Sequence, residues 1–226
     1  MNSNTVKQVV SKNRVHNHGE VLTAEREVSD MIALVEHETE RIESRFLEPA
    51  CGTGNFLLPV LERKLQLVRK RYGKSQMEFE RVSAVAVGSL YGVELLLDNA
   101  EVCRQRLFQL FDHFYTNLYK DRAKDQLRDT VRFILKKNIV EGDALSLQTT
   151  GDNPKPITFS EWSLVNGSYV KRRDYTFEEL IPKNVEDQSL FEGMKLSDIN
   201  EPVFTPKPIK EYPLVHVSEL QYETDN

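Results

Sequence analysis

The sequence lacks the long apolar run that a membrane-spanning helix needs, which is about 18 consecutive residues. Residues 1–20 are polar and lack the apolar centre of a secretory signal peptide. The two cysteines, Cys51 and Cys103, are too few and too far apart for a zinc knuckle or a disulfide framework. Internal repeats and low-complexity tracts are also missing. We therefore expect a soluble, cytoplasmic protein with no membrane segment and no metal site.

A strong excess of either charge is missing too. The 30 Lys and Arg residues oppose 35 Asp and Glu residues, which gives a formal net charge of −5. This balance disfavours a protein covered in nucleic acid, but it allows a local basic groove, because electrostatic steering depends on where the charges lie. The 226 residues, 39% of them hydrophobic, suffice for one domain with a real core and an appendage.

Three short runs are predicted to be buried strands, at 45–48, 89–94 and 138–141. Helical patterns separate them, so the order strand, helix, strand, helix, strand predicts a parallel sheet covered by helices. The charged residues 69–82 are expected to form an exposed insertion before the second strand.

Helices are predicted from apolar residues that recur at helical spacing. One runs from Glu25 to about Glu43, and a second begins near Asn55 with Pro59 in its first turns. Asp98 is expected to cap a third helix, and a fourth covers about 125–136.

The chain changes character after residue 150. The segments 157–165 and 168–175 flank Asn166-Gly167, which is a strong signal for a two-residue β-hairpin turn. From Pro182 onward the chain is rich in proline and poor in apolar runs. This tail is predicted to be extended, packed on a partner surface or partly disordered.

The first predicted strand ends in a glycine-rich loop. Gly52 and Gly54 precede a helix, where small residues and free N–H groups let an anionic ligand approach. A dinucleotide-binding loop would need a third glycine, and Leu57 stands at that position. A lone Gly-x-Gly is also compatible with a purely structural turn.

Acidic residues follow the other two strands. Glu94 ends the second strand and could accept two ribose hydroxyls, while Asp143 follows the third and could accept from an adenine amino group. Each acid alone would be an ordinary solvated strand end. Because ligands of open parallel sheets bind beyond the carboxyl ends of the strands, the three strand ends together predict one ligand site.

The segment 46–56, Phe-Leu-Glu-Pro-Ala-Cys-Gly-Thr-Gly-Asn-Phe, closely resembles the cofactor loop of adenine-N6 DNA methyltransferases, above all modification enzymes of restriction–modification systems. Gly19–Thr23 is similar to the family's Gly-x-(Phe/Tyr)-x-Thr-Pro element, although Ala24 replaces the proline. Residues 91–94 resemble its ribose-binding acid, and residues 142–145 resemble its adenine-binding element.

The resemblance covers about residues 18–146 and implies an α/β class I (Rossmann-like) S-adenosylmethionine-dependent methyltransferase fold. It also implies three parts: an N-terminal helical segment closing over the cofactor (1–44), the S-adenosylmethionine-binding α/β domain (45–150) and a C-terminal β-hairpin with a proline-rich tail (151–226). The implied cofactor-binding residues are Thr23, Glu48, Pro49, Ala50, Cys51, Gly52, Gly54, Asn55, Glu94, Asp143 and Ala144.

The catalytic part of the resemblance is missing. The family holds the target adenine with an Asn/Asp-Pro-Pro-aromatic turn after a fourth apolar strand, and the closest approach here is Asn153-Pro154-Lys155. Neither cysteine follows a proline, so a cytosine-C5 nucleophile is also absent. We therefore expect an incomplete sheet of three strands, and no catalytic residue is assigned.

Basic and aromatic residues alternate in the predicted hairpin, where Lys171, Arg172 and Arg173 could contact nucleic acid. An exposed charged strand is the simpler interpretation. The functional prediction is an S-adenosylmethionine-dependent adenine-N6 DNA methyltransferase of a restriction–modification or phage modification system. The alternatives are an inactive S-adenosylmethionine-binding or assembly protein, one half of a split enzyme whose second polypeptide supplies the catalytic half, and a catalytic turn of different sequence after residue 150.

Overall fold

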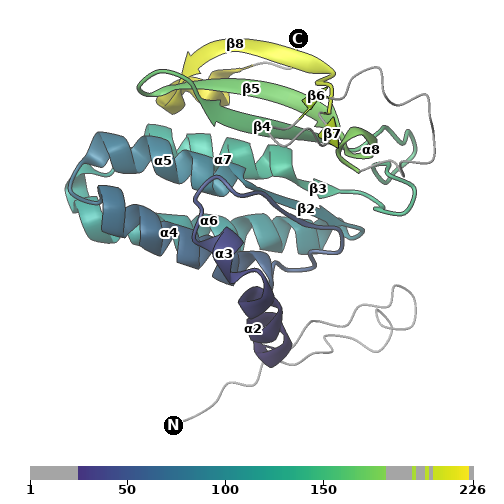
Figure 1. Ribbon diagram of the computed structural model, residues 1–226, viewed down its shortest axis with the longest axis horizontal. Coiled ribbons are helices and arrows are strands. Elements are labelled where there is room, and N and C mark those ends of the chain that lie inside the picture. The colour runs from purple at the N-terminus through teal and green to yellow at the C-terminus, as the bar shows by residue number, and fades with distance from the viewer. Residues whose placement is uncertain (1–24, 182–194, 197–201, 204–205, 224–226) are drawn as a thin grey trace.

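The computed structural model describes residues 25–181, 195–196, 202–203 and 206–223 (Figure 1). The predicted contact Thr23 and most of the proline-rich tail lie outside these residues. The elements are α2 (Glu25–Leu34), α3 (Glu36–Thr39), β1 (Phe46–Glu48), α4 (Leu57–Tyr72), α5 (Gln76–Gly88), β2 (Leu90–Glu94), α6 (Leu97–Tyr119), η1 (Lys120–Arg122), α7 (Asp125–Asn138), β3 (Ile139–Glu141), β4 (Thr158–Leu164), β5 (Tyr169–Thr176), α8 (Phe177–Leu180), β6 (Lys195–Leu196), β7 (Pro202–Val203), β8 (Lys210–His216) and η3 (Val217–Tyr222).

The three predicted strands form one parallel sheet in the order β1-β2-β3. Phe46 pairs with Leu90 and Gly92 pairs with Ile139, so β2 is the central strand and is buried along its whole length. The alternating strand and helix order is thereby confirmed. This is a mixed α/β arrangement compatible with a methyltransferase domain.

Four helices pack beside this sheet. α4 contacts α5 and α6, and α7 contacts the same two helices, so the four enclose one apolar core (Figure 1). The core includes Val60, Leu65, Cys103, Leu107 and Phe111, which are fully buried. Except for Cys103 these are large aliphatic or aromatic side chains at helical spacing, and their burial stabilises the unit by about 25 cal/mol for each Å² of apolar surface.

Residues 69–82 are not the exposed insertion that their charge suggested. α4 continues to Tyr72, and α5 begins at Gln76 behind Ser75, whose hydroxyl accepts the N–H of Glu78. Phe79 and Val82 are buried three residues apart on one face of α5. The many charged side chains hid this pattern, and one of them, Glu80, is itself buried and accepts the hydroxyl of Tyr115.

The end of one helix and the cap of another also differ from the prediction. The N-terminal helix is interrupted at Val35 and ends at Thr39, although Val28 and Ile32 bury the expected face. Asp98 is not the cap of α6, because the helix begins at Leu97 and the capping position is Leu96. The Glu94 carboxylate of β2 accepts the N–H of Leu96, and the Asp98 carboxylate accepts the N–H of Asn99.

The hairpin after residue 150 is confirmed. β4 and β5 pair antiparallel on either side of Asn166-Gly167, but the turn is longer than the predicted two residues. The Val165 N–H bonds to the Tyr169 carbonyl (3.0 Å), so residues 166–168 form the loop, with Gly167 at a positive φ of 58°. β8 adds a third strand, in the order β4-β5-β8, from a region predicted only as extended tail. This second sheet and η3 lie over α5 and α7 (Figure 1).

The start of the second sheet also covers one face of the parallel sheet. Tyr91 and Val93 of β2 pack with Ile157, Phe159 and Phe177 in a separate apolar cluster. Tyr91 and Phe159 meet edge to face with ring centroids 5.4 Å apart. The hairpin region is therefore part of the packed molecule.

Candidate functional site

The glycine-rich loop lies between β1 and α4, at the carboxyl end of the parallel sheet. Cys51 donates its backbone N–H to Val93 of β2 (2.9 Å), and Gly54 donates back to Cys51 (2.8 Å). Gly52 and Gly54 have φ of 52° and 87°, a region that favours glycine. A Cβ on Gly54 would lie 2.8 Å from Sγ of Cys103, so both conformation and space require glycine there.

Glu94 reaches into this loop from the end of β2. Its carboxylate accepts the backbone N–H of Gly52 (2.8 Å) and that of Leu96 (3.1 Å). The side-chain amide of Asn99 donates to the same carboxylate at 3.3 Å. Glu94 is only 8% exposed, so these bonds hold a charged group beside the loop. Two residues predicted from separate strand ends are thus brought into contact.

A cation reaches the loop from the opposite side. Nη1 of Arg106, on α6, donates to the carbonyl of Thr53 (2.6 Å), to the Thr53 hydroxyl (3.0 Å) and to Oδ1 of Asn55 (2.9 Å). Burial lowers the pKa of Arg106. No sequence pattern singles out this residue, because it lies in the middle of a long helix, far from any strand end.

The first half of the loop carries a less buried acid. Glu48 is half-buried, and Ala50 donates its N–H to the Glu48 carboxylate at 3.4 Å. Burial raises the pKa of Glu48, while the Ala50 bond acts in the opposite direction. Pro49 and Ala50 are exposed, so this side of the loop is accessible.

The two cysteines are free and buried beside the loop. A Cβ on Gly92 would lie 2.8 Å from Sγ of Cys51, so the thiol occupies the space over that glycine. The neighbouring Cys103 thiol, followed by burial, raises the pKa of Cys51 far above its usual range. Cys51 thus packs in the core as a neutral thiol rather than a nucleophile.

The third strand end lies next to the second, because Gly142 donates its N–H to the Glu94 carbonyl (2.9 Å). The Asp143 carboxylate accepts the N–H of Leu145 (2.9 Å), and this bond lowers the pKa of Asp143. Ala144 is partly buried against the cluster around Tyr91. Asp143 therefore shapes its own turn and keeps lone pairs available for another donor.

Exposed leucines surround these acids. Leu95, Leu97 and Leu145 are 44%, 49% and 96% exposed, directly after the second and third strand ends. Apolar side chains this exposed, close to buried polar groups, are typical of ligand-binding surfaces. Sequence patterns did not single them out, since a leucine beside a helix start is expected in the core.

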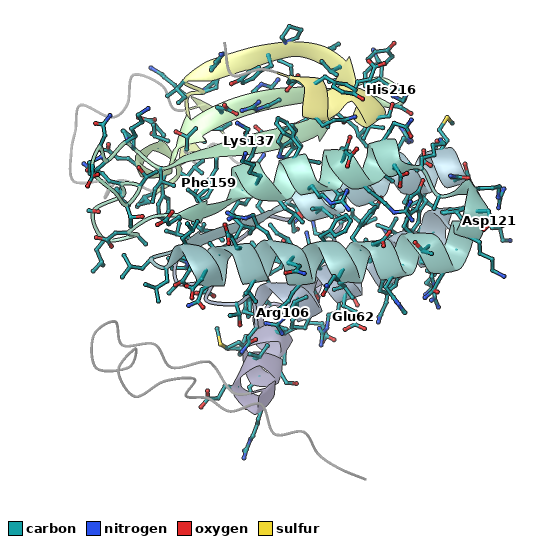
Figure 2. The ribbon with its side chains drawn as sticks, turned by 180° about the vertical axis from the view of Figure 1, so that it is seen from behind. Glu62, Arg106, Asp121, Lys137, Phe159 and His216 are labelled. Carbon is teal, nitrogen blue, oxygen red and sulfur yellow. The ribbon has the colours of Figure 1, made fainter. Side chains whose placement is uncertain are left out.

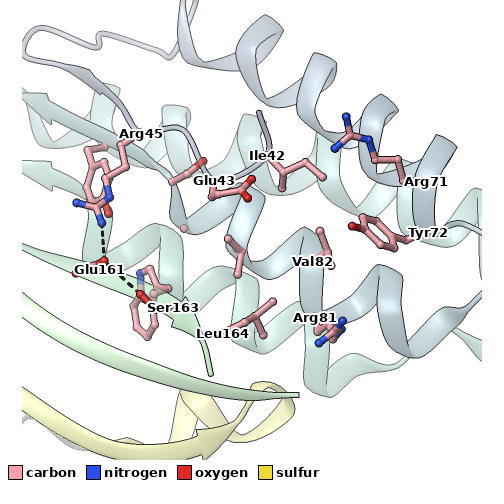
Figure 3. Close-up of a pocket in the computed structure, with 15 residues that line it drawn as sticks. Ile42, Glu43, Arg45, Arg71, Tyr72, Arg81, Val82, Glu161, Ser163 and Leu164 are labelled. Atoms are coloured by element: carbon pink, nitrogen blue, oxygen red, sulfur yellow. Dashed lines mark hydrogen bonds and ion pairs between the residues drawn. The ribbon is translucent and has the colours of Figure 1, made fainter. Parts of the chain in front are cut away.

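A cavity of about 490 Å³ lies elsewhere, near the amino ends of the strands (Figure 3). It is bounded by Arg45 before β1, by Val82 and neighbours on α5, and by Glu161–Leu164 of β4. Arg45 and Glu161 form an ion pair across it. None of the residues that line this cavity is a predicted cofactor contact.

The basic residues of the hairpin are placed differently from one another. Arg172 is 1% exposed and donates to both carboxylate oxygens of Asp174 (2.9 and 2.8 Å). Its guanidinium also stacks on Tyr212, 4.0 Å from the ring centroid. As placed, Arg172 offers no surface to a phosphate, which corrects its assignment as a nucleic-acid contact. Lys171 and Arg173 are partly exposed and face Glu211.

Two kinds of feature are absent from the described part of the chain. None of its helices is both long and apolar enough to cross a membrane. Nor does it bring together three or more His, Cys, Asp or Glu side chains that could hold a metal ion.

Comparisons with known proteins place these features in a family. The MmeI DNA-methyltransferase domain matches residues 23–170, which is more than half of the 226-residue chain. Searches of curated proteins and of solved structures gave no match. The matched range contains the glycine loop, Glu94, Arg106 and Asp143. The match supports a DNA methyltransferase of the restriction–modification type, and the chain belongs to the family of MmeI-type DNA-methyltransferase domains.

Proposed function

We propose that the chain binds S-adenosylmethionine at the loop between β1 and α4, and that it serves adenine-N6 methylation of DNA. The observation that carries the first half is the bond from the Gly52 N–H to the Glu94 carboxylate. It joins the glycine loop and the acid of the next strand in one site, at the edge where ligands of open parallel sheets bind.

The residues present fit the chemical groups of this cofactor. The Glu94 carboxylate has about four acceptor sites, and the bonds from Gly52, Leu96 and Asn99 use three of them. One ribose hydroxyl would take the remaining site, and the second would replace the longest of these bonds, that from Asn99 at 3.3 Å. Glu48, on the accessible side of the loop, suits the ammonium group. Backbone N–H groups before α4 suit the carboxylate. When bound, S-adenosylmethionine supplies a methyl group activated by its sulfonium.

The adenine ring would lie beyond the second and third strands. Asp143 and Ala144 are proposed to contact its polar edge, and the exposed Leu95, Leu97 and Leu145 offer apolar surface to its faces. Pro49, Ala50, Cys51, Gly54 and Asn55 shape the loop, and Thr23 is retained as a proposed contact at the methionine end.

Adenine-N6 specificity is supported by the resemblance of residues 46–56 alone. The turn that would hold a flipped adenine has no counterpart in the sequence. Asn153 and Pro154 lie exposed in the loop between β3 and β4, away from any strand end. Among the described residues, the parallel sheet holds three strands and no fourth that could present such a turn.

A second candidate follows from the edge of the sheet: the chain is one half of a split methyltransferase. Phe46 donates its N–H toward β2, so the N–H and C=O of Leu47 point away from the sheet. Leu47 is 39% exposed. At the other edge, Arg104 donates to the carbonyl of Ile139 (2.8 Å) and blocks β3. A further strand, on a second polypeptide, would therefore join at β1.

Ligand-induced stabilisation tests the cofactor site. Millimolar S-adenosylmethionine should raise the melting temperature of the wild-type chain by mass action, and Glu94→Ala should abolish most of the shift. Glu101→Ala is the matched control, since Glu101 is an exposed acid on α6, and its shift should equal that of the wild type. No shift in the wild type at millimolar ligand would refute the cofactor proposal.

Methyl transfer tests the reaction. Purified chain, labelled S-adenosylmethionine and adenine-rich DNA should give labelled N6-methyladenine, either alone or after addition of a partner that carries an apolar strand and an Asn-Pro-Pro-aromatic turn. Activity only with the partner supports the split enzyme. Cofactor binding without transfer in both cases supports the binding or assembly protein.

A further inference from the structure

The glycine loop is held from two sides by groups of opposite charge. Glu94 accepts the N–H of Gly52, and Arg106 donates to the carbonyl of Thr53, one residue further on. Figure 2 shows Arg106 on α6, toward the side where α2 lies. The acid was expected from the sequence as a ligand contact, whereas the cation has no role in the proposed chemistry.

The loop needs such an anchor. Thr53 lies between two glycines with positive φ. Glycine restricts the backbone little, so this Gly-Thr-Gly segment has many alternative conformations that compete with the one observed. Within the loop, one backbone bond, from Gly54 to Cys51, closes the turn. A loop that is ordered before the ligand arrives binds more tightly, because the ligand does not have to supply the ordering free energy.

Arg106 also fixes a side chain. Its Nη1 donates to Oδ1 of Asn55, so the amide oxygen faces α6 and the amide nitrogen is turned the other way. The Thr53 hydroxyl accepts from the same nitrogen, which sets its rotamer. The two N–H groups of this nitrogen are shared among three acceptors, one carbonyl and two side chains, before the start of α4.

We propose that Arg106 is the positioning residue of the cofactor loop: it holds Thr53 and Asn55 in the binding-ready conformation and acts on the ligand only through them. The inference rests on the proposed function for the identity of the ligand, S-adenosylmethionine. The restraint on the loop itself does not depend on that identity.

The chain offers a matched control on the same helix. Arg104 also donates from Nη1 to a backbone carbonyl, that of Ile139, at 2.8 Å. It is two residues away and serves the edge of β3 instead of the loop. Arg104→Gln and Arg106→Gln therefore remove the same charge and the same type of bond, at different places.

The first experiment is calorimetric titration of S-adenosylmethionine into folded variants. Arg106→Gln should raise the dissociation constant about tenfold, the effect of losing one charge-assisted bond. The dissociation constant of Arg104→Gln should stay within twofold of that of the wild type. Asn55→Ala and the double variant complete a cycle, in which the combined loss should be clearly smaller than the product of the two single losses. The inference would be overturned if Arg106→Gln bound as tightly as the wild type. It would also be overturned if the loss of affinity in the double variant equalled the product of the two single losses.

The second experiment needs no ligand and separates this inference from the proposed function. The amides of Gly52 and Gly54 should exchange with solvent at least tenfold faster in Arg106→Gln than in Arg104→Gln. Unchanged exchange would show that Arg106 does not restrain the loop. If the wild type failed to bind S-adenosylmethionine while the exchange rates differed as expected, the proposed ligand would be wrong and the role of Arg106 would stand.

Discussion

The two three-stranded sheets of this chain use the same kinds of charged side chain for different purposes. Beside the parallel sheet, Glu94 and Arg106 bind the backbone of a loop next to exposed leucines. In the antiparallel sheet, Arg172 and Asp174 bind each other and are 1% and 6% exposed. A charge surrounded entirely by its own chain stabilises a core, whereas a charge at a strand end beside accessible groups can serve a ligand.

The residues around the Arg172–Asp174 pair extend this comparison. Ser160 and Tyr212 donate bonds of 2.7 and 2.9 Å to the Asp174 carboxylate, and the buried Glu223 carboxylate lies 3.7 Å from Nη1 of Arg172. Substitutions in this pair should therefore change stability, and substitutions around the glycine loop should change binding first.

The largest effect is expected from Arg172→Met. Removal of the cation leaves the buried Asp174 carboxylate without its charge partner and removes the stacking on Tyr212. The free energy of unfolding should fall by about 3–5 kcal/mol in urea titrations. Arg173→Gln is the control, since Arg173 is partly exposed and faces Glu211, and it should cost at most about 1 kcal/mol. Equal losses in the two variants would contradict the contrast between buried and exposed cations.

Gly54→Ala should affect both properties. The new Cβ would lie 2.8 Å from Sγ of Cys103, at a φ of 87°, so we expect a loss of about 1–3 kcal/mol in stability. Because the loop must also shift, binding of S-adenosylmethionine should fall by much more than in a variant equally destabilised elsewhere. Gly151→Ala is a suitable control: its φ is also positive but nothing lies within 4 Å of the new Cβ. Similar cofactor affinity in both variants would show that the loop tolerates displacement.

The pH dependence of stability should report on Lys64. This lysine is fully buried and donates to the carbonyls of Ile42 and Ser44 and to the Ser89 hydroxyl. Burial lowers its pKa to about 7. Between about pH 7 and the ordinary lysine pKa of 10.5 the unfolded chain therefore binds more protons at this site, and the free energy of unfolding rises with pH by up to about 1.4 kcal/mol per unit. In Lys64→Met this contribution is lost, so the stability difference between wild type and variant should grow in favour of the wild type as pH rises. A difference independent of pH would refute the depressed pKa.

Much of the parallel unit could be predicted from the sequence, because its signals are local. Apolar runs that end in Glu48, Glu94 and Glu141 gave the strands, and helical spacing gave the faces of α4, α6 and α7. The meeting of Gly52 and Glu94 followed from topology alone, since parallel strands end at one edge.

Long-range contacts account for what could not be predicted. Arg106 contacts a loop that lies more than fifty positions away in the sequence. The local sequence around Arg172 predicts an exposed basic residue, because nothing in it indicates that Tyr212 of β8 packs over the guanidinium. The helix α5 was missed for a local reason: most of its residues up to Arg81 are polar, and its buried face has few apolar positions in the first two turns. The corrected placement of Arg172 limits the proposed nucleic-acid contacts of the hairpin to Lys171 and Arg173.

Asn138 has a consequence for how the molecule folds. Its side-chain amide donates to the Gly88 carbonyl, before β2, and accepts the Ser160 N–H of β4, both at 3.0 Å. One buried amide thus joins the starting ends of the parallel strands to the edge of the other sheet. Detachment of either sheet would break one of these two buried hydrogen bonds. The parallel sheet with its helices and the antiparallel sheet are therefore expected to unfold in a single cooperative transition. Deletion of the antiparallel sheet is expected to destabilise the rest of the fold.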